Sequence, residues 1–253
     1  MNSSPSFAER LKKETRRVHT MAEKTAFMRG FLRGTSTVES YTRLLRGLVE
    51  IYRPMEAAIQ EQKTHPVLSL FHFPAVFRVK SLEKDLAFLA GPFWESAIAV
   101  PRAAVAYRAE LEELAERAPE LLPAHAYTRY MGDVSGGQIL KKIAANSMGL
   151  APNGGGLDFY EFPQLKNLAE FKLEFRTALN MAVYRENGLD DRLIKEANTA
   201  FRRNIALFRE LEGGFWSAFL RQFTLVRLLN PGLKKSLPPL SASGRKTASR
   251  PIL

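Results

Sequence analysis

The chain has 253 residues, enough for one large domain or two small ones, and its 45% apolar and 25% charged residues are ordinary for a soluble globular protein. It has no cysteine, which excludes a disulfide framework, a thiolate metal site and a cysteine nucleophile. The formal net charge of +11 fits an anionic partner, whether nucleic acid, anionic lipid, an acidic protein or an anionic small molecule.

The sequence shows no pattern of export or membrane insertion. The segment from Ser6 to Glu23 is too highly charged for the apolar core of a signal peptide. The chain has no run of eighteen apolar residues, so we expect no membrane span and a cytoplasmic protein. Residues 1–5 are expected to form a flexible leader, and residues 230–253, rich in Pro, Ser, Lys and Arg, a disordered basic tail.

Helical periodicity dominates the rest of the chain, and no segment keeps the alternation of a β-strand. The first helix is expected to open at Ser6, whose side chain can form a capping box with Glu9. Further helical segments are expected at 37–62, 81–90, 101–117, 167–180, 190–211 and 215–229. We expect Ser81 to open its helix and Val105 to lie on the buried side of its own. The sequence thus predicts one all-α domain over residues 6–229.

One edge of the first helix carries a stripe of polar residues. Lys12, Arg16, His19 and Glu23 follow one another at steps of four, three and four residues. For a single histidine, a surface position without a role is the commoner interpretation, and the two cations alone fit a solvated face. Together the residues also fit a site for a planar dianion with a metal at its centre. His19 would bind the metal, the cations would neutralise carboxylates, and Glu23 would hold the second ring nitrogen.

The stretch from Tyr127 to Lys142 reads YTRYMGDVSGGQILKK and carries three glycines in a helical context. Each glycine inside a helix costs about 1 kcal/mol relative to alanine. Gly132 and Gly136 are four residues apart and therefore share one face, with Asp133 beside the first. Such a bare face suits either a crossing helix or something flat and bulky that presses on the backbone. The glycines by themselves favour the crossing helix.

These motifs together resemble the haem oxygenase family. The segment LKKETRRVHTMAEKTAFM (11–28) is similar to that family's proximal-histidine helix. The segment ELLPAHAYTRYMGDVSGGQILKKIA (120–144) is similar to its distal helix, in which GD-x-SGGQ is a highly specific motif. The resemblance covers about residues 10–212, although Met131 and Val134 stand where the family usually has leucine. It implies a helical bundle in which haem is sandwiched between a proximal helix and a kinked distal helix.

The resemblance also implies roles for single residues. By position, His19 is the proximal ligand of the haem iron, Gly132 and Gly136 form the distal surface, and Asp133 orders distal water. At the propionate edge the resemblance places Lys12, Arg16, Tyr127, Lys172 and Arg176. In the extended distal network or the haem wall it places Tyr52, Arg129, Asn204 and Phe201.

The family cleaves haem to biliverdin, carbon monoxide and Fe²⁺, and the resemblance implies the same activity for this chain. The cofactors implied are haem, O₂ and electrons from ferredoxin or an NADPH-dependent reductase. A large apolar disc with two carboxylates needs an apolar pocket with cations at one rim. Oxygen must also be directed sideways onto a meso carbon, which requires the distal backbone close above. Because cations fix the propionates, the match at Lys12, Lys172 and Arg176 implies biliverdin IXα.

Three other functions stay open on the sequence. A haem carrier or sensor would keep the pocket without the chemistry. A basic helical protein could bind nucleic acid or anionic lipid, but the charge is spread out and no nucleic-acid motif is present, so we expect no specific nucleic-acid partner. A helical relative could use another small substrate, against which His19 argues. We expect a monomer with an acidic electron donor such as ferredoxin or flavodoxin, and peripheral membrane contact only through the tail.

Overall fold

The computed structural model describes residues 5–151 and 154–229, and for residues 213–229 it describes the course of the helix only. The expected leader, apart from Pro5, and the expected basic tail lie outside the described residues. The chain divides into two units, Met1–Gly214 and Phe215–Leu253, and every site residue predicted from the sequence belongs to the first. The proposed domain bounds of 6–229 stay a prediction.

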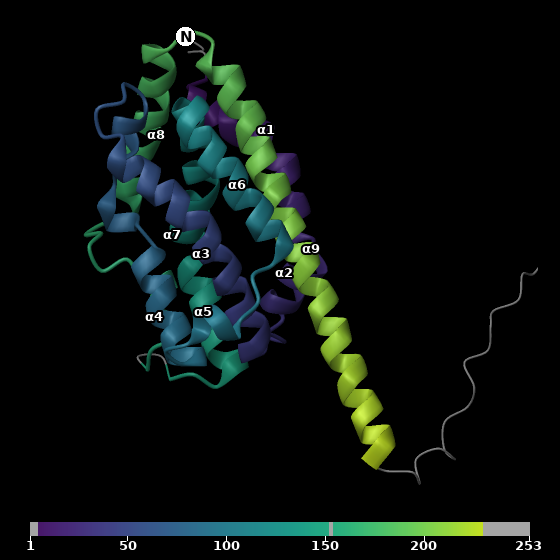
Figure 1. Ribbon diagram of the computed structural model, residues 1–253. Helices are drawn as coiled ribbons and strands as arrows, with labels where there is room; N and C mark the ends of the chain where they lie inside the picture. Colours follow the sequence, from purple (N-terminus) through teal and green to yellow (C-terminus); the bar gives the residue numbers. More distant parts are fainter. Residues whose placement is uncertain (1–4, 152–153, 230–253) are drawn as a thin grey trace, which may run out of the picture. The chain divides into compact units, whose positions relative to one another are not determined.

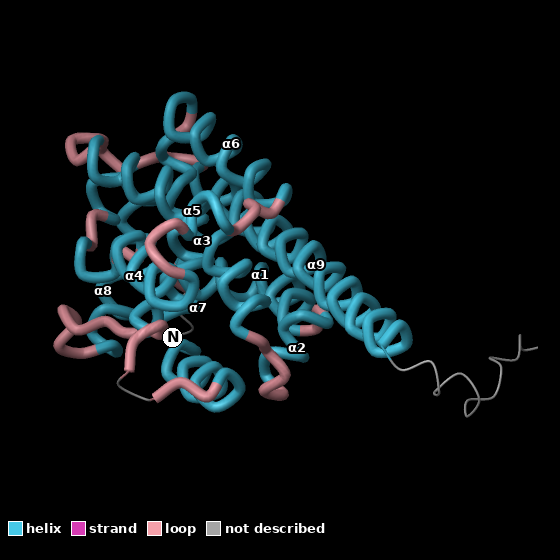
Figure 2. Tube along the Cα trace, turned by 60° about the horizontal axis from the view of Figure 1, so that its bottom comes forward, coloured by secondary structure: helices cyan, strands magenta, loops and turns pink. Residues whose placement is uncertain are grey.

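The described residues form helices joined by loops and contain no strand (Figures 1 and 2), which confirms the all-α fold. The α-helices are α1 (Phe7–Glu23), α2 (Ala26–Leu32), α3 (Val38–Glu61), α4 (Val79–Ala90), α5 (Trp94–Ala97), α6 (Arg102–Arg117), α7 (Leu122–Met148), α8 (Leu168–Arg185) and α9 (Leu189–Leu229). The 3₁₀ turns are η1 (Leu68–Phe71), η2 (Pro74–Val76), η3 (Pro119–Leu121) and η4 (Asp158–Tyr160). None of the described helices combines the length and the apolar character that crossing a membrane would require.

Helix α3 is buried along most of its length and packs against α4 and α6. Its inward face carries large apolar and aromatic side chains, and Tyr41, Tyr52 and Met55 are each fully buried. Burial of such side chains stabilises the fold by roughly 1.5–3 kcal/mol each relative to exposure. Helix α3 also contacts α7, the helix that contains the glycine motif. Tyr52 of α3 is therefore close enough to bond to a residue of α7.

Helix α1 starts with the predicted capping box, in which Ser6 and Glu9 bond to each other's backbone N–H groups. It lies beside the first half of α9 in Figure 1, and polar contacts connect the two helices near the start of each. Arg10 donates to Asp190 at 2.6 Å and also bonds to Asp191. The N–H of Ala8 donates to Asn180 of α8 at 2.9 Å, so α1 is held by both C-terminal helices.

Helix α7 runs without interruption from Leu122 to Met148, so its three glycines do not end it. It stops at Gly149, which has φ +65°, a left-handed conformation that glycine adopts without strain. The kink implied by the family resemblance stays a prediction.

The start of α4 differs from the prediction at Ser81. The helix begins at Val79, and its N-cap residue Arg78 provides no side-chain cap. Glu56 of α3 supplies the missing acceptor, because its carboxylate oxygens accept from the N–H groups of Arg78 at 2.5 Å and Val79 at 3.2 Å. A carboxylate from another helix thus fixes where α4 starts, which local sequence could not indicate.

The prediction that Val105 lies on the buried side of α6 was also wrong. Val105 is 39% exposed, because the buried stripe of α6 is formed by Ala104, Tyr107 and Leu111. The Tyr107 hydroxyl forms a hydrogen bond of 2.8 Å with Nδ1 of the fully buried His125. His125 is therefore a structural residue of the core.

The last two helices are longer than the sequence indicated. Helix α8 continues to Arg185 rather than ending near residue 180, and α9 is a single helix where two segments, 190–211 and 215–229, were expected. The cause in α8 is visible at Ala182, which is fully buried and belongs to its inward face. Tertiary packing thus extends helices beyond the bounds that local patterns suggest.

Candidate functional site

A network of four buried polar side chains joins α3, α7 and α9. The Tyr52 hydroxyl donates a short hydrogen bond to Oδ2 of Asp133, and Arg129 donates to the Tyr52 oxygen at 3.0 Å. Arg129 also donates to Oδ1 of Asp133 at 3.2 Å and to Oδ1 of Asn204 at 2.9 Å. Asn204 in turn donates to the carbonyl of Ala200 at 2.8 Å. The family resemblance had placed Tyr52, Arg129 and Asn204 in an extended distal network and had given Asp133 the role of ordering distal water. The structure joins these four side chains by hydrogen bonds.

Burial sets the electrostatics of this network. It raises the pKa of Asp133 above the ordinary range, whereas the Arg129 charge and the Tyr52 hydrogen bond oppose that rise. Burial likewise raises the pKa of the Tyr52 hydroxyl, which therefore stays protonated and acts as a donor. The result is a carboxyl group that is held by two donors and has a raised affinity for a proton.

The glycines of α7 divide into two kinds. A Cβ built on Gly132 would meet no atom within 4 Å, and one on Gly136 would meet only the Leu140 side chain at 3.8 Å. A Cβ on Gly137 would instead stand 3.6 Å from the Tyr160 carbonyl oxygen. The lack of a side chain at Gly137 therefore allows the backbone at Tyr160 to approach α7 closely. Gly132 and Gly136 leave open space beside the helix, so a crossing element does not account for them.

His19 lies on α1 with its side chain 53% exposed. Its ring meets the edge of the buried Phe201 ring at a centroid distance of 5.5 Å and an interplanar angle of 73°. Oε1 of Glu23 lies 3.6 Å from Nδ1, which is longer than a hydrogen bond. Phe201 thus contacts the imidazole, and the Glu23 carboxylate lies on the Nδ1 side of the ring without a hydrogen bond to it.

The predicted cationic edge lies where α1, α7 and α8 meet. Burial raises the pKa of Tyr127, and the Thr15 hydroxyl and the Arg176 charge oppose this rise. Arg176 also helps to lower the pKa of Glu9 on α1, after the stronger effect of hydrogen bonds from Ser6. The charge of Arg176, an exposed residue of α8, therefore acts on one residue of α7 and one of α1. The other predicted cations of this edge are Lys12, Arg16 and Lys172, of which the first two are exposed.

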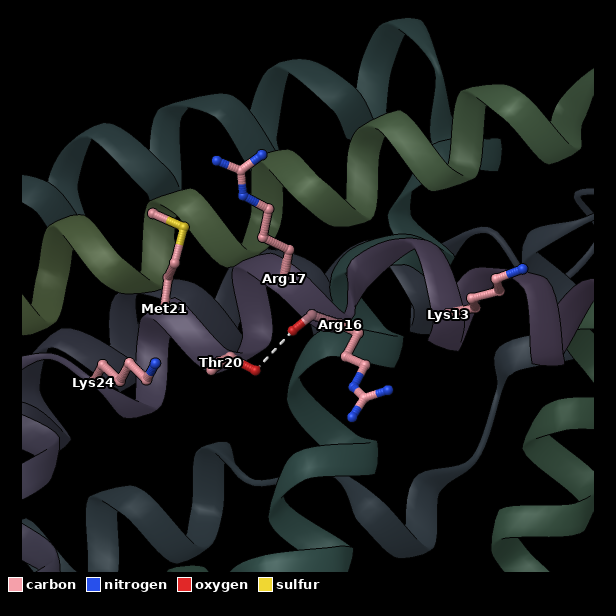
Figure 3. Close-up of a pocket in the computed structure, with 6 residues that line it drawn as sticks. All are labelled: Lys13, Arg16, Arg17, Thr20, Met21 and Lys24. Carbon is pink, nitrogen blue, oxygen red and sulfur yellow. Dashed lines mark hydrogen bonds between the residues drawn. The ribbon is translucent and has the colours of Figure 1, made fainter.

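A pocket of about 500 Å³ lies along the solvent face of α1 (Figure 3). It is lined by Lys13, Arg16, Arg17, Thr20, Met21 and Lys24. In the close-up, Arg17 and Met21 point to one side of the helix and Arg16 to the other, while the Thr20 hydroxyl donates to the Arg16 carbonyl at 3.0 Å. Of the predicted site residues this pocket contains only Arg16. It is a basic surface on the outside of α1 rather than the space between His19 and the glycines.

Two buried residues that support the site escaped the sequence-based prediction. Arg78 is 4% exposed and its charge lowers the pKa of Asp133. Glu56 accepts from the Tyr130 hydroxyl at 3.2 Å, and burial raises the pKa of its carboxyl to about 7. Glu56 occupies a core position of α3 beside Met55, and a charged residue within a buried stripe was the available signal.

The comparisons with known proteins agree on one family. The model of the family described as Heme oxygenase matches residues 5–210. Heme oxygenase 1 of Synechocystis sp. is 41% identical over 215 residues, which is 85% of this chain and 88% of that protein. Heme oxygenase 1 of Homo sapiens is 42% identical over 206 residues, 81% of this chain and 71% of that protein.

The similar solved structures belong to the same family as the similar sequences. The crystal structure of heme oxygenase-1 from Synechocystis sp. in complex with heme matches with a TM-score of 0.81 at 40% identity, covering 88% of this chain and all of that one (100%). The fold and the relatives define an all-helical enzyme of haem metabolism. The chain belongs to the haem oxygenase family, whose members degrade haem.

Proposed function

We propose that this chain cleaves haem with O₂ and electrons at the α-meso carbon, which yields biliverdin IXα, carbon monoxide and Fe²⁺. The observation that carries the proposal is the open space beside Gly132, next to the buried Asp133 and its donors. A helix edge without side chains lets a flat substrate approach the backbone, and the adjacent carboxyl can deliver a proton. Haem fits this edge because it is flat, apolar and wide.

His19 is proposed to bind the substrate iron through Nε2. A neutral imidazole on one side leaves the opposite side of the iron available for O₂, and the bound iron supplies the oxygen chemistry. Phe201 packs against the imidazole and limits its rotation, and Glu23 stands beside Nδ1. Phe201 therefore helps to orient the imidazole before haem binds, and Glu23 is the acceptor that Nδ1 can reach by a small movement.

Asp133 is proposed to hold an ordered water on the distal side and to relay a proton to the reacting oxygen. Arg129 and Tyr52 fix both carboxyl oxygens, so Asp133 cannot swing onto the metal. Burial raises the pKa of this carboxyl, which favours the uptake of a proton that the group can then pass on. The glycine edge at the same time allows oxygen to be directed sideways onto the ring.

The cationic edge is proposed to set which meso carbon is attacked. Lys12, Lys172 and Arg176 would hold the two propionates, with Arg16 and Tyr127 beside them. Charge-assisted hydrogen bonds to two carboxylates fix the rotation of a disc in its pocket. The placement of Arg176 near both α1 and α7 supports this edge.

The decisive experiment adds hemin to the purified protein, followed by a reductant in air, and records the visible spectrum. The Soret band should decay and biliverdin should form, and chromatography should identify the IXα isomer. A carrier or sensor would keep its Soret band. Recovery of the β or δ isomer would leave the activity standing but contradict the proposed propionate contacts.

Replacing Gly132 by alanine is expected to raise the stability of the protein and to lower its activity. The added methyl group has space in the protein, so the free energy of unfolding should rise by about 1 kcal/mol, as for glycine-to-alanine changes inside helices. The same methyl group would occupy the substrate face, so biliverdin formation should fall at least about tenfold by displacement of the reacting groups. Urea unfolding and product yield measure the two effects.

Gly149→Ala is the matched control for Gly132→Ala. It lies at the end of the same helix with φ +65°, where a side chain is strained by about 1–2 kcal/mol. Here stability should fall while biliverdin formation stays unchanged. The proposed role of Gly132 is contradicted if alanine at that position leaves the product yield at the wild-type level.

The electron donor is proposed to be an acidic protein that docks on the outer α1 patch, which we define as Lys13, Arg17 and Lys24. All three side chains are exposed and line the basic pocket of Figure 3. Lys13 and Arg17 belong to the same helix as His19, and Lys24 is the C-cap of that helix, so a donor bound there is close to the proposed iron site. Cytoplasmic location and a monomeric state stay predictions.

Turnover driven by an acidic donor such as ferredoxin is expected to fall at least about threefold when salt rises from roughly 0.05 M to 0.5 M, because screening weakens charge-guided docking. The double variant Lys13→Glu with Arg17→Glu should lower kcat/KM for the donor in the same way. Lys80→Glu is the control, since Lys80 is exposed on α4, which lies apart from α1 in Figures 1 and 2. If donor-driven turnover does not change with salt, the positive charge does not guide the electron donor and serves another partner.

A further inference from the structure

The short turn η4 lies against α7 at its third glycine, Gly137. The position of a Cβ on Gly137 is 3.6 Å from the carbonyl oxygen of Tyr160, and Nε2 of Gln138 donates to the same oxygen at 3.1 Å. Gly136, which the family resemblance places on the distal surface together with Gly132, directly precedes this contact. The location of the Tyr160 carbonyl therefore limits how this part of α7 can move relative to the substrate.

The start of η4 is held by Asp85 of α4. The Asp85 side chain is fully buried, and its Oδ1 and Oδ2 accept from the N–H groups of Asp158 and Phe159, each at 2.8 Å. Asp85 stands between Leu82 and Leu86 on the buried side of its helix, where a carboxylate is costly unless its hydrogen bonds are made. Two charge-assisted bonds to consecutive amides fix both the position and the orientation of the turn.

The turn also touches the distal network. The ring of Phe159 meets the ring of Tyr52 edge-on at a centroid distance of 6.0 Å, and the Tyr52 hydroxyl bonds to Asp133. Arg78 holds the same turn, since it donates to the Phe159 carbonyl at 3.3 Å. We call Asp85 and Arg78 together the η4 clamp. The Arg78 charge acts on Asp133 as well, so its replacement would alter the network directly. Asp85 is the member of the clamp whose replacement tests the position of the turn itself.

We propose that Asp85 is a positioning residue for the reaction, which acts through η4 to fix where the Gly136–Gly137 segment of α7 stands relative to the bound substrate. This inference rests on the proposed function. Asp85 itself touches neither substrate nor reacting atoms, and its effect passes through the Tyr160 carbonyl. Because a misplacement of about 1 Å near the reacting groups can cost about 10²-fold in rate, a looser turn should lower the yield of the correct product.

The first test uses the full-length protein without haem. Asp85→Asn keeps the shape of the side chain but offers one acceptor oxygen instead of two, so one amide of η4 loses its partner. Hydrogen exchange at the amides of Asp158 and Phe159 should accelerate at least about tenfold, as for the loss of one buried hydrogen bond. Lys84→Met is the matched control. It removes only the exposed ion pair with Asp158 and should leave the exchange rates unchanged.

The second test adds hemin and a reductant to the same variants. In Asp85→Asn, the fraction of consumed haem that is recovered as biliverdin should fall at least about threefold, while hemin affinity stays within about threefold of the wild-type value. Gln138→Leu removes the bond from α7 to the Tyr160 carbonyl without altering Asp85, and should lower the same fraction. Lys84→Met should give the wild-type fraction.

The outcomes separate the possible explanations. If Asp85→Asn accelerates exchange but leaves the biliverdin fraction unchanged, the clamp is only structural and the inference is overturned. If Asp85→Asn does not fold, Gln138→Leu decides, since a wild-type fraction overturns the inference and a lowered fraction supports it. A wild-type protein that forms no biliverdin would refute the proposed function, and this inference with it, whatever the exchange rates at η4.

Discussion

Replacement of His19 by alanine is expected to abolish the native haem complex while leaving the fold intact. The His19 side chain is 53% exposed and makes one ring contact, with Phe201, so stability should change by no more than about 0.5 kcal/mol. Residues that merely orient a metal ligand typically contribute 10–100-fold to affinity or activity, so loss of the ligand itself should lower biliverdin formation at least about 100-fold. The ferrous–CO spectrum and the product yield are the measurements.

Two comparisons make the His19→Ala result specific. Added imidazole should restore part of the activity, because it can fill the space that the side chain leaves and donate the same nitrogen to the iron. Glu23→Gln changes only the group beside Nδ1 and should have a smaller effect, about tenfold or less. A ferrous–CO spectrum of His19→Ala identical to that of the wild type would show that another residue binds the iron.

The stripe that contains His19 shows which features of the site can be predicted from the sequence. Helical periodicity correctly placed Lys12, Arg16 and His19 on one edge of α1, because that periodicity depends on local geometry alone. Which segments lie opposite that edge depends on packing between residues more than 150 positions apart, such as the contact of His19 with Phe201. Only the resemblance to a family indicated those long-range neighbours.

The glycine motif shows a different limit. The sequence predicted a helix face without side chains but favoured a crossing helix as the reason. The structure separates the cases: Gly137 is approached by the Tyr160 backbone, whereas Gly132 has open space beside it. Spacing alone treats the glycines as equivalent, because it does not record which neighbour each of them meets.

Buried charges were the third kind of difficulty. Glu56 and Asp85 each occupy a core position within an apolar helical stripe, and the partners of each are backbone N–H groups at the start of another element. Such partners carry no sequence signature, because every residue except proline has an N–H group. An acidic residue at a core position is the signal that identifies these supports, and it was not used in the prediction of Ser81 as the start of α4.

Replacement of Asp133 is the second change with a large expected effect, and two variants are needed to interpret it. Asp133→Ala removes the buried partner of Arg129 and should destabilise the protein by about 3–5 kcal/mol, since it leaves a charge without compensation. Asp133→Asn keeps one acceptor for Tyr52 or Arg129 and should be far less destabilising. Neither variant removes the proposed iron ligand, so both should still bind hemin when folded.

The amide of Asp133→Asn cannot take up and release a proton, so the two variants should lose catalysis together although they differ in stability. General acid–base groups contribute about 10²–10⁴-fold, and biliverdin formation should fall within that range. Haem consumption should turn instead to peroxidase-like chemistry, detected by oxidation of a phenolic reporter in the presence of peroxide. If Asp133→Asn keeps the wild-type biliverdin yield, the carboxyl serves only to pair with Arg129, and the proton must come from another group near the glycine edge.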